Sequence, residues 1–151
     1  MNWKYIIIIF FTCIAIFSLW FYRNHPLTST ITIANTKFEI ELAITPEEKS
    51  KGLGYRNSLL PKHGMLFPYD HKERYDFGMM GMKFPLDFIW IAGGKIVRID
   101  KNIPIPAPNT PDDKLKTYSA GDPIDYILEV NAGFSDQNKI KVGDSVDLTG
   151  I

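Results

Sequence analysis

The run Phe77–Met82 contains side chains that could bind a soft metal ion. Gly78 precedes Met79 and Gly81 precedes Met82, so two methionines lie three residues apart in a segment with little steric bulk. Thioether sulfurs are soft ligands that select Cu(I), and this spacing would allow a copper site. Methionine more commonly fills irregular core space, and the two glycines suit a bulge or a close approach in a strand. Core packing is therefore the main prediction for these methionines, with copper binding as the alternative.

Asp87 is the second candidate for chemistry, because it interrupts an apolar run with Leu86 before it and Phe88 after it. An ionisable carboxyl group among apolar neighbours suits a general acid or base. The same residue could instead point outward, or accept backbone N–H bonds at a bend after Pro85. We predict a structural role first, ligand contact second and catalysis third.

Arg56 and Tyr118 complete the predicted ligand-binding residues, which are Arg56, Met79, Met82, Asp87 and Tyr118. The guanidinium of Arg56 could clamp an anion, although an arginine just past a helix end more often pairs with a nearby acid. Tyr118 lies in a turn-rich segment of the kind that often binds ligands. Glu129, inside an apolar strand, is predicted to point outward. No nucleophile-and-base pair and no zinc spacing of histidines can be assembled, so we predict no catalytic residue, metal or cofactor.

An uncharged apolar run, Tyr5–Tyr22, precedes all of these residues. Its eighteen positions would extend about 27 Å as an α-helix, close to the hydrocarbon thickness of a bilayer. We therefore predict that residues 1–23 form an uncleaved membrane anchor and that the chain crosses the membrane once. A cleaved signal peptide is the first alternative, but the run ends in bulky residues where cleavage needs small ones. A lipoprotein processed at Cys13 is the second. The short N-terminal tail favours an extracytoplasmic domain.

The remainder has the size and charge of one globular domain without a nucleic-acid surface. Lys4 and Arg23 account for two of the 17 basic residues, which leaves 15 basic against 17 acidic residues beyond the anchor. No block of lysine and arginine occurs there, and a nucleic-acid partner is not expected. We assign 24–29 to a short linker and 30–151 to a single domain. The sole cysteine lies in the apolar run, so this domain has no internal disulfide.

Alternating polarity predicts that this domain is built mainly of β-strands. Residues 30–34 and 37–44 alternate around a turn, and 86–92 is joined by Gly93–Gly94 to 95–99, which predicts two hairpins. Further strands are expected at 126–130 and 145–148, whereas 55–75 reads mostly as loop. Thr45 and Glu48 form a capping box that predicts a short helix ending near Gly52 or Gly54, and 133–139 suits a second short helix. The proline-rich stretch 103–111 must be an edge or an extended loop. The predicted fold is a small β-sandwich or partly closed barrel.

Four segments in this order resemble the domain of unknown function 192 family. They are Leu42–Arg56 with its capping box, Gly64–Phe67, Phe77–Ile91, and Tyr118–Asp144 with its Gly121, Pro123 and Tyr126–Glu129. The resemblance implies a compact, mostly β domain, often behind a signal or anchor segment, and it implies no reaction. Two positions differ from the family: this chain has Gly78 where Trp is common and Gly81 where Asn is common.

These observations favour a membrane-anchored, extracytoplasmic binding or accessory module without catalysis of its own. Its expected partners are the membrane, through Tyr5–Tyr22, and a small ligand or envelope protein. An acid–base enzyme centred on Asp87 is the first alternative. A Cu(I)-binding protein that uses Met79 and Met82 is the second.

Overall fold

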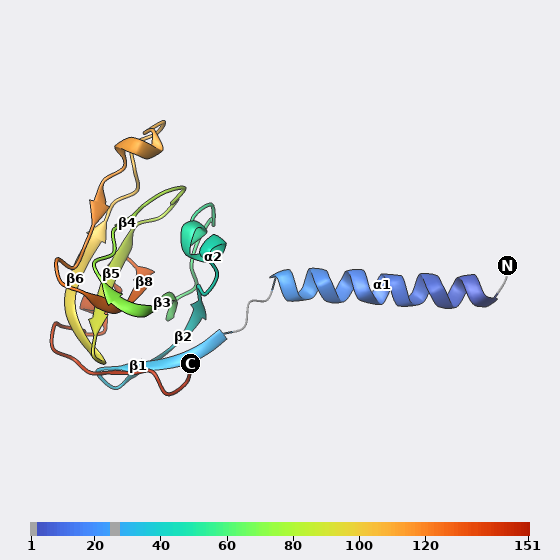
Figure 1. Ribbon diagram of the computed structural model, residues 1–151, viewed down its shortest axis with the longest axis horizontal. Helices are drawn as coiled ribbons and strands as arrows, with labels where there is room; N and C mark the ends of the chain where they lie inside the picture. Colours follow the sequence, from blue (N-terminus) through green and yellow to red (C-terminus); the bar gives the residue numbers. More distant parts are fainter. Residues whose placement is uncertain (1–2, 25–27) are drawn as a thin grey trace.

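The computed structural model describes residues 3–24 and 28–151, which form one helix and a β-rich body (Figure 1). Within the predicted linker 24–29, residues 25–27 lie outside the described residues, Asn24 ends α1, and β1 begins at Thr28. The helices are α1 (Trp3–Asn24), α2 (Pro46–Lys51) and α3 (Phe134–Gln137), with a 3-10 turn η1 (Asp112–Lys114). The strands are β1 (Thr28–Ile33), β2 (Thr36–Leu42), β3 (His63–Glu73), β4 (Phe77–Gly78), β5 (Leu86–Ala92), β6 (Lys95–Ile103), β7 (Thr117–Tyr118), β8 (Ile124–Asn131) and β9 (Val146–Asp147).

The apolar N-terminal run forms α1, and side chains such as Phe11 and Phe17 are exposed on it. Within the part of the chain that the structure describes, no helix combines the length and the apolar character that crossing a bilayer requires. The predicted membrane-spanning helix is therefore unsupported.

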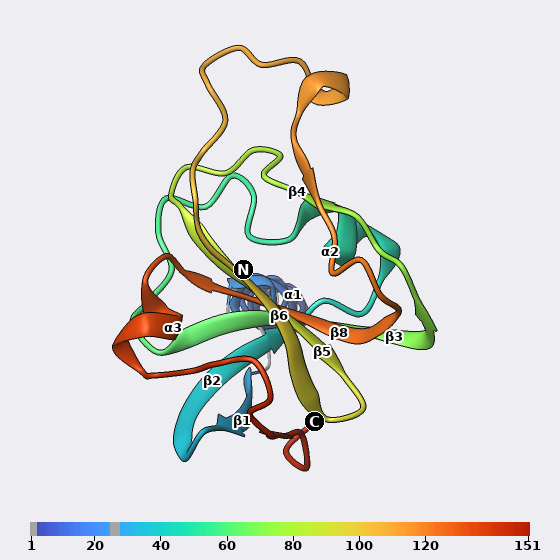
Figure 2. The same cartoon turned by 90° about the vertical axis from the view of Figure 1, so that its left-hand side faces the viewer.

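The prediction of a mainly β domain is confirmed, and its sheet curls into a partly closed barrel. Seven strands follow the order β6-β5-β8-β3-β2-β1-β9, and every neighbouring pair is antiparallel except β2–β3. An isolated bridge between Lys95 and Ser145, with the Val146 N–H donating to the Gly94 carbonyl at 2.9 Å, joins the two edges at one end. Figure 2 shows that the chain between β6 and β7 projects from this body.

Local sequence signals account for the hairpins and for α2. The β1–β2 hairpin turns at Ala34 and Asn35, both with positive φ, and β5–β6 turns at Gly93 and Gly94. The capping box is present, because the Glu48 N–H donates to Thr45 Oγ1 at 3.2 Å and the Thr45 N–H donates to Glu48 Oε2 at 2.9 Å. These predictions are confirmed.

The prediction of a loop over 55–75 is wrong for its second half, which forms β3. Gly64–Phe67 lies at the centre of the sheet, antiparallel to β8, and Gly64–Leu66 also runs parallel to β2. This strand is stabilised by partners that are distant in the sequence, so its own local pattern is weak. Both of its faces are covered, which replaces the expected alternation with a short apolar run.

The central strands separate two hydrophobic cores. The first fills the inside of the curled sheet and includes Phe38, Leu66, Ile89, Leu128 and Phe134. The second lies on the opposite face, where α2, the loop after it and the 74–85 segment cover side chains that include Leu53, Phe67, Phe88, Trp90 and Ile127. Strands β3, β5 and β8 contribute to both cores, and residues on these strands can be buried whichever way they point.

Candidate ligand-binding site

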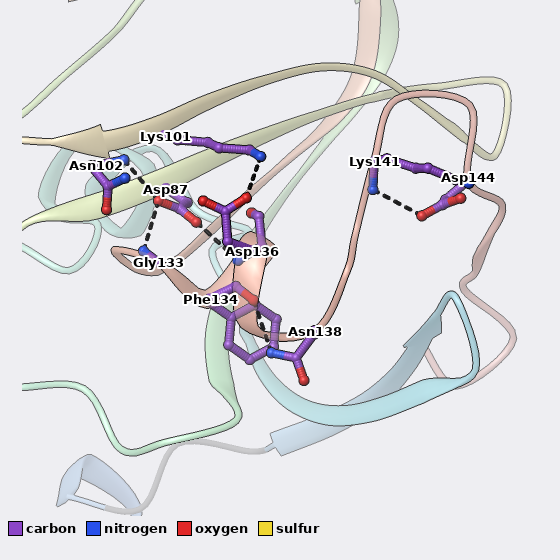
Figure 3. Close-up of polar contacts among 10 residues, drawn as sticks. Asp87, Lys101, Asn102, Gly133, Phe134, Asp136, Asn138, Lys141 and Asp144 are labelled. Carbon is purple, nitrogen blue, oxygen red and sulfur yellow. Dashed lines mark hydrogen bonds and ion pairs between the residues drawn. The ribbon is translucent and has the colours of Figure 1, made fainter.

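Two acidic residues are buried in this sheet, and the first, Asp87, is fully bonded to backbone. Its Oδ1 accepts the N–H groups of Asn102 at 2.8 Å and Gly133 at 3.1 Å, and its Oδ2 accepts that of Ser135 at 3.0 Å. The residue is 0% exposed. Figure 3 shows the carboxylate between β6 and the start of α3. Asp87 thus joins β6 and the start of α3 to β5, and its contact with a ligand stays a prediction.

The second acid, Glu129 of β8, lies on the other face of the sheet. Glu129 pairs with Phe88 and Asp87 pairs with Val130 in the β5–β8 register. Directly opposite residues share a face and successive residues alternate, so the two carboxyl groups point in opposite directions. Phe88 belongs to the second core and Val130 to the first. The prediction that Glu129 faces outward is therefore wrong.

Glu129 is 4% exposed, and its Oε2 has no hydrogen-bond partner among the described residues. Burial is the main cause that raises the pKa of Glu129 to about 8, while the backbone N–H of Leu53 and the positive charge of Arg56 partly oppose the rise. The carboxyl group is consequently neutral for the most part at pH 7. A neutral carboxyl carries one O–H donor, and here that donor has no protein acceptor.

The chain that follows α2 passes directly over this carboxyl group. Gly52 has φ +48°, and a Cβ built there would lie 3.3 Å from Phe67 Cζ and 3.5 Å from Glu129 Oε2. Gly54 allows no side chain either, because its Cβ would lie 2.8 Å from the carbonyl oxygens of Lys51 and Met80. The two glycines therefore let the backbone approach the sheet closely enough to enclose Glu129.

A pocket of about 230 Å³ opens above Glu129. Its walls come from residues 49–54, from Phe67 and Tyr69 of β3, and from the segment around Gly78, and we call it the Glu129 pocket. Pockets for drug-sized ligands measure roughly 300–1,000 Å³, so this one suits a smaller molecule. Its walls combine aromatic rings and thioethers with charged groups.

Lys49 supplies a positive charge at the wall of the Glu129 pocket. Its Nζ donates to the Pro68 carbonyl at 2.5 Å and lies 4.4 Å from the centroid of the Tyr69 ring. An ammonium group has three N–H donors, so two remain for a ligand. Burial is the main cause that raises the pKa of Tyr69 to about 12, with smaller contributions from Tyr75 and Glu129. The phenol therefore stays protonated at neutral pH.

Arg56 lies near Glu129 but is bonded elsewhere. Its guanidinium makes a bidentate pair with Glu41, with N–O distances of 2.6 and 2.8 Å. This is the pairing with a nearby acid that the sequence suggested as the alternative to clamping a ligand. Arg56 therefore influences the Glu129 carboxyl through its charge.

The remaining predicted residues are divided between two pockets. Met82 lines the Glu129 pocket, whereas Met79 and Tyr118 line a second, more apolar pocket of about 220 Å³ beneath the projecting chain. The Tyr118 ring also packs edge-on against Phe88, with centroids 5.7 Å apart. The structure thus places Met79 and Met82 at different pockets, and Asp87 on the opposite face of the sheet.

Sequence reasoning missed Glu129, although one signal was present. In β8 the residues on either side, Leu128 and Val130, belong to one core, and Ile127 on the face of Glu129 belongs to the other. Apolar residues at both phases of the alternation are typical of a strand covered on both faces. An acid within such a strand must be buried, and it then needs a functional or structural reason.

The sequence belongs to the DUF192 family, described as "Uncharacterized ACR", which it matches over residues 29–148. No curated protein matches it. One similar crystal structure is that of a Sinorhizobium meliloti 1021 protein provisionally described as a transcription regulator, with TM-score 0.73 and 26% identity over 83% of this chain and 97% of that chain. Another is a protein of unknown function from Novosphingobium aromaticivorans DSM 12444, with TM-score 0.67 and 27% identity over 80% of this chain and 84% of the other.

Proposed function

We propose that this DUF192 domain is a small-molecule-binding module and that its ligand occupies the Glu129 pocket. The observation that carries the proposal is the unpartnered Oε2 of the buried Glu129, a residue that lines this pocket. Burying a polar atom without a partner costs roughly 1–3 kcal/mol. A ligand that bonds to this atom removes that cost, which explains why a carboxyl group is retained inside an apolar core.

Binding without catalysis fits this pocket better than the acid–base enzyme considered from the sequence. Asp87 is bonded to three backbone N–H groups on the opposite face, and Arg56 is bonded to Glu41. Glu129 therefore has no second acid or base bonded to it within the described part of the chain. We do not propose nucleic-acid binding for this domain by analogy with the Sinorhizobium protein, because the sequence of the domain has no cluster of lysine and arginine residues.

The binding test is a screen of the full chain with small carboxylates, amines, amides and alcohols of three carbons, followed by ligand-observed NMR. Gly78 lines the pocket, and a Cβ there would meet only the Lys116 carbonyl oxygen at 3.7 Å. Gly78→Trp should therefore be tolerated by the fold, and a bulky ring at the pocket wall should weaken binding. Lys37→Trp, on the exposed face of β2, is the control and should bind normally. If no probe binds the parent chain, or if Gly78→Trp binds as well as the parent, the proposal is wrong.

We further propose that α1 associates with a membrane and holds the β domain outside the cytoplasm. The support comes from the uncharged run Tyr5–Tyr22 and from the exposure of apolar side chains along α1. Exposed apolar surface of this extent would otherwise remain in contact with water. The full chain should sediment with membranes after cell lysis, whereas recovery in the soluble fraction would contradict the proposal.

A further inference from the structure

Resting on the proposed function, we infer that the Glu129 pocket binds a small organic carboxylate, which accepts the Glu129 O–H and a Lys49 N–H. The ligand would place its carboxylate between these two donors and its hydrocarbon part against the aromatic and thioether walls. If the ligand belongs to another chemical class, the pocket can still be a binding site.

The Glu129 carboxyl group is a hydrogen-bond donor toward a ligand. The Leu53 N–H donates to the carboxyl group, and Oε2 has no partner. A neutral carboxyl keeps its carbonyl oxygen as the better acceptor, so the proton belongs on the oxygen that no N–H contacts. A ligand must therefore present an acceptor, and it reaches this enclosed oxygen only if the Gly52 backbone shifts. An ionised carboxylate is the strong acceptor, because a hydrogen bond to a charged oxygen is roughly twice as strong as a neutral one.

The ionised side chains around the Glu129 pocket give it a net positive charge. With Glu129 neutral, the ionised groups at the pocket are Lys49, Lys51 and Asp76, and the first two are positive. The nearby Arg56 is paired with Glu41, and Tyr69 is neutral because its pKa is about 12. The local charge is therefore positive and favours an anion. A cationic ligand would have to ionise Glu129 and also approach two lysines.

The aromatic and thioether side chains that line the pocket favour an organic acid over an inorganic anion. Phe67 and Phe77 stand edge to face with centroids 5.1 Å apart, and both line the pocket with Met80 and Met82. A phosphate or sulfate ion would need polar donors on all sides, whereas part of this wall is aromatic and thioether surface. A carboxylate with a short hydrocarbon group satisfies both parts of the pocket.

The test measures binding of sodium propanoate to the full chain in a non-ionic detergent, against propylamine, propanamide, propanol and inorganic phosphate. Propanoate should bind most tightly. Because burial raises the pKa of Glu129 to about 8, its affinity should fall about tenfold between pH 7 and pH 9 as the proton is lost. An N-acetylated dialanine distinguishes a peptide chain end from a free acid, and binding of either supports the carboxylate class.

Variants separate the roles of the two donors. Glu129→Leu removes the donor and should weaken propanoate binding at least tenfold. Glu129→Gln keeps an N–H donor that does not titrate, so it should bind propanoate with no loss between pH 7 and pH 9. Lys49→Met keeps the packing against Tyr69 but loses the charge, and it should weaken binding several-fold. Lys37→Met, an exposed lysine of β2, is the control and should have no effect.

Three results would overturn the carboxylate inference. They are equal binding of propanoate and propanamide, preference for the amine, and propanoate binding that survives unchanged in Glu129→Leu. In the first two cases the pocket still binds a ligand and the proposed function stands. If no probe binds at all, both the ligand class and the proposed function are wrong.

Discussion

The two buried acids of this domain differ in what satisfies them, and the difference separates architecture from binding. Asp87 and Glu129 occupy neighbouring strands on opposite faces of the same sheet. Three backbone N–H groups surround the Asp87 carboxylate, whereas Oε2 of Glu129 has no partner. The first arrangement stabilises the fold by itself, and the second leaves an oxygen free for the ligand that we propose. Burial of a charged residue type is therefore a weak guide to function until the partners of each oxygen are known.

The largest expected effect comes from removing Asp87, the acid whose carboxylate accepts three backbone N–H bonds. Asp87→Ala leaves the N–H groups of Asn102, Gly133 and Ser135 without their acceptor, the last of them in a buried site, and we expect a loss of roughly 3–5 kcal/mol in the free energy of unfolding. Urea denaturation measures the loss. Asp147→Ala is the control, because Asp147 makes similar turn bonds to Thr149 but is exposed. Equal losses for the two variants would contradict the role given to Asp87.

The next effect is a pH dependence that belongs to Glu129. Its pKa rises from an ordinary value of 4.5 to about 8 on folding. Between pH 4.5 and pH 8 the folded state holds a proton that the unfolded state has lost. The contribution of Glu129 to the free energy of unfolding is therefore largest below pH 4.5, and it falls as the pH rises to 8. The slope approaches about 1.4 kcal/mol per pH unit. Glu129→Gln should remove this slope, as urea denaturation from pH 5 to pH 8 would reveal. A slope that persists in the variant would assign it to other groups.

A smaller effect is expected where the chain crosses over Glu129. Gly52→Ala adds strain at φ +48° and a methyl group 3.3 Å from Phe67. Gly143→Ala adds strain at φ +94° with nothing within 4 Å, so it isolates the backbone contribution. We expect about 1–2 kcal/mol of destabilisation from strain in Gly143→Ala, and a larger loss in Gly52→Ala, where ψ −136° adds to the strain and the methyl group approaches Phe67. If Gly52→Ala and Gly143→Ala lose equal stability in thermal unfolding, the added methyl group at Gly52 does not disturb the packing against Phe67.

The smallest expected effect concerns Arg56, whose side chain is partly exposed. Replacing Arg56 with Gln removes a positive charge that lowers the pKa of Glu129, so this pKa should move further upward. Carbon-13 NMR titration of the glutamate carboxyls measures the shift. The stability cost should stay near 1 kcal/mol because the Arg56–Glu41 pair is not fully buried. An unchanged Glu129 titration would show that Arg56 is electrostatically remote from the pocket.

The sequence was sufficient for the parts of the fold that depend on neighbouring residues. The turn at Asn35, the Gly93–Gly94 turn and the Thr45–Glu48 capping box are local signals, and each was found where expected. Strand β3 was missed because it is held by β2 and β8 from distant parts of the chain. The candidate site was predicted only in part: Met82 lies at the Glu129 pocket, but Glu129 itself was placed outward. Alternation alone cannot tell the two faces of a strand apart when both are buried.

The parallel pairing of β2 with β3 has a consequence for how this family could diversify. Two parallel neighbours cannot be joined by a tight turn, so residues 43–62 must travel back along the outside of the sheet. That return path holds none of the seven strands of the main sheet, yet it carries α2 and Gly52. Its length and composition can therefore change while strand register is preserved. Exchanging this connection between relatives should therefore alter the wall that residues 49–54 form, while Phe67 and Glu129 keep their places.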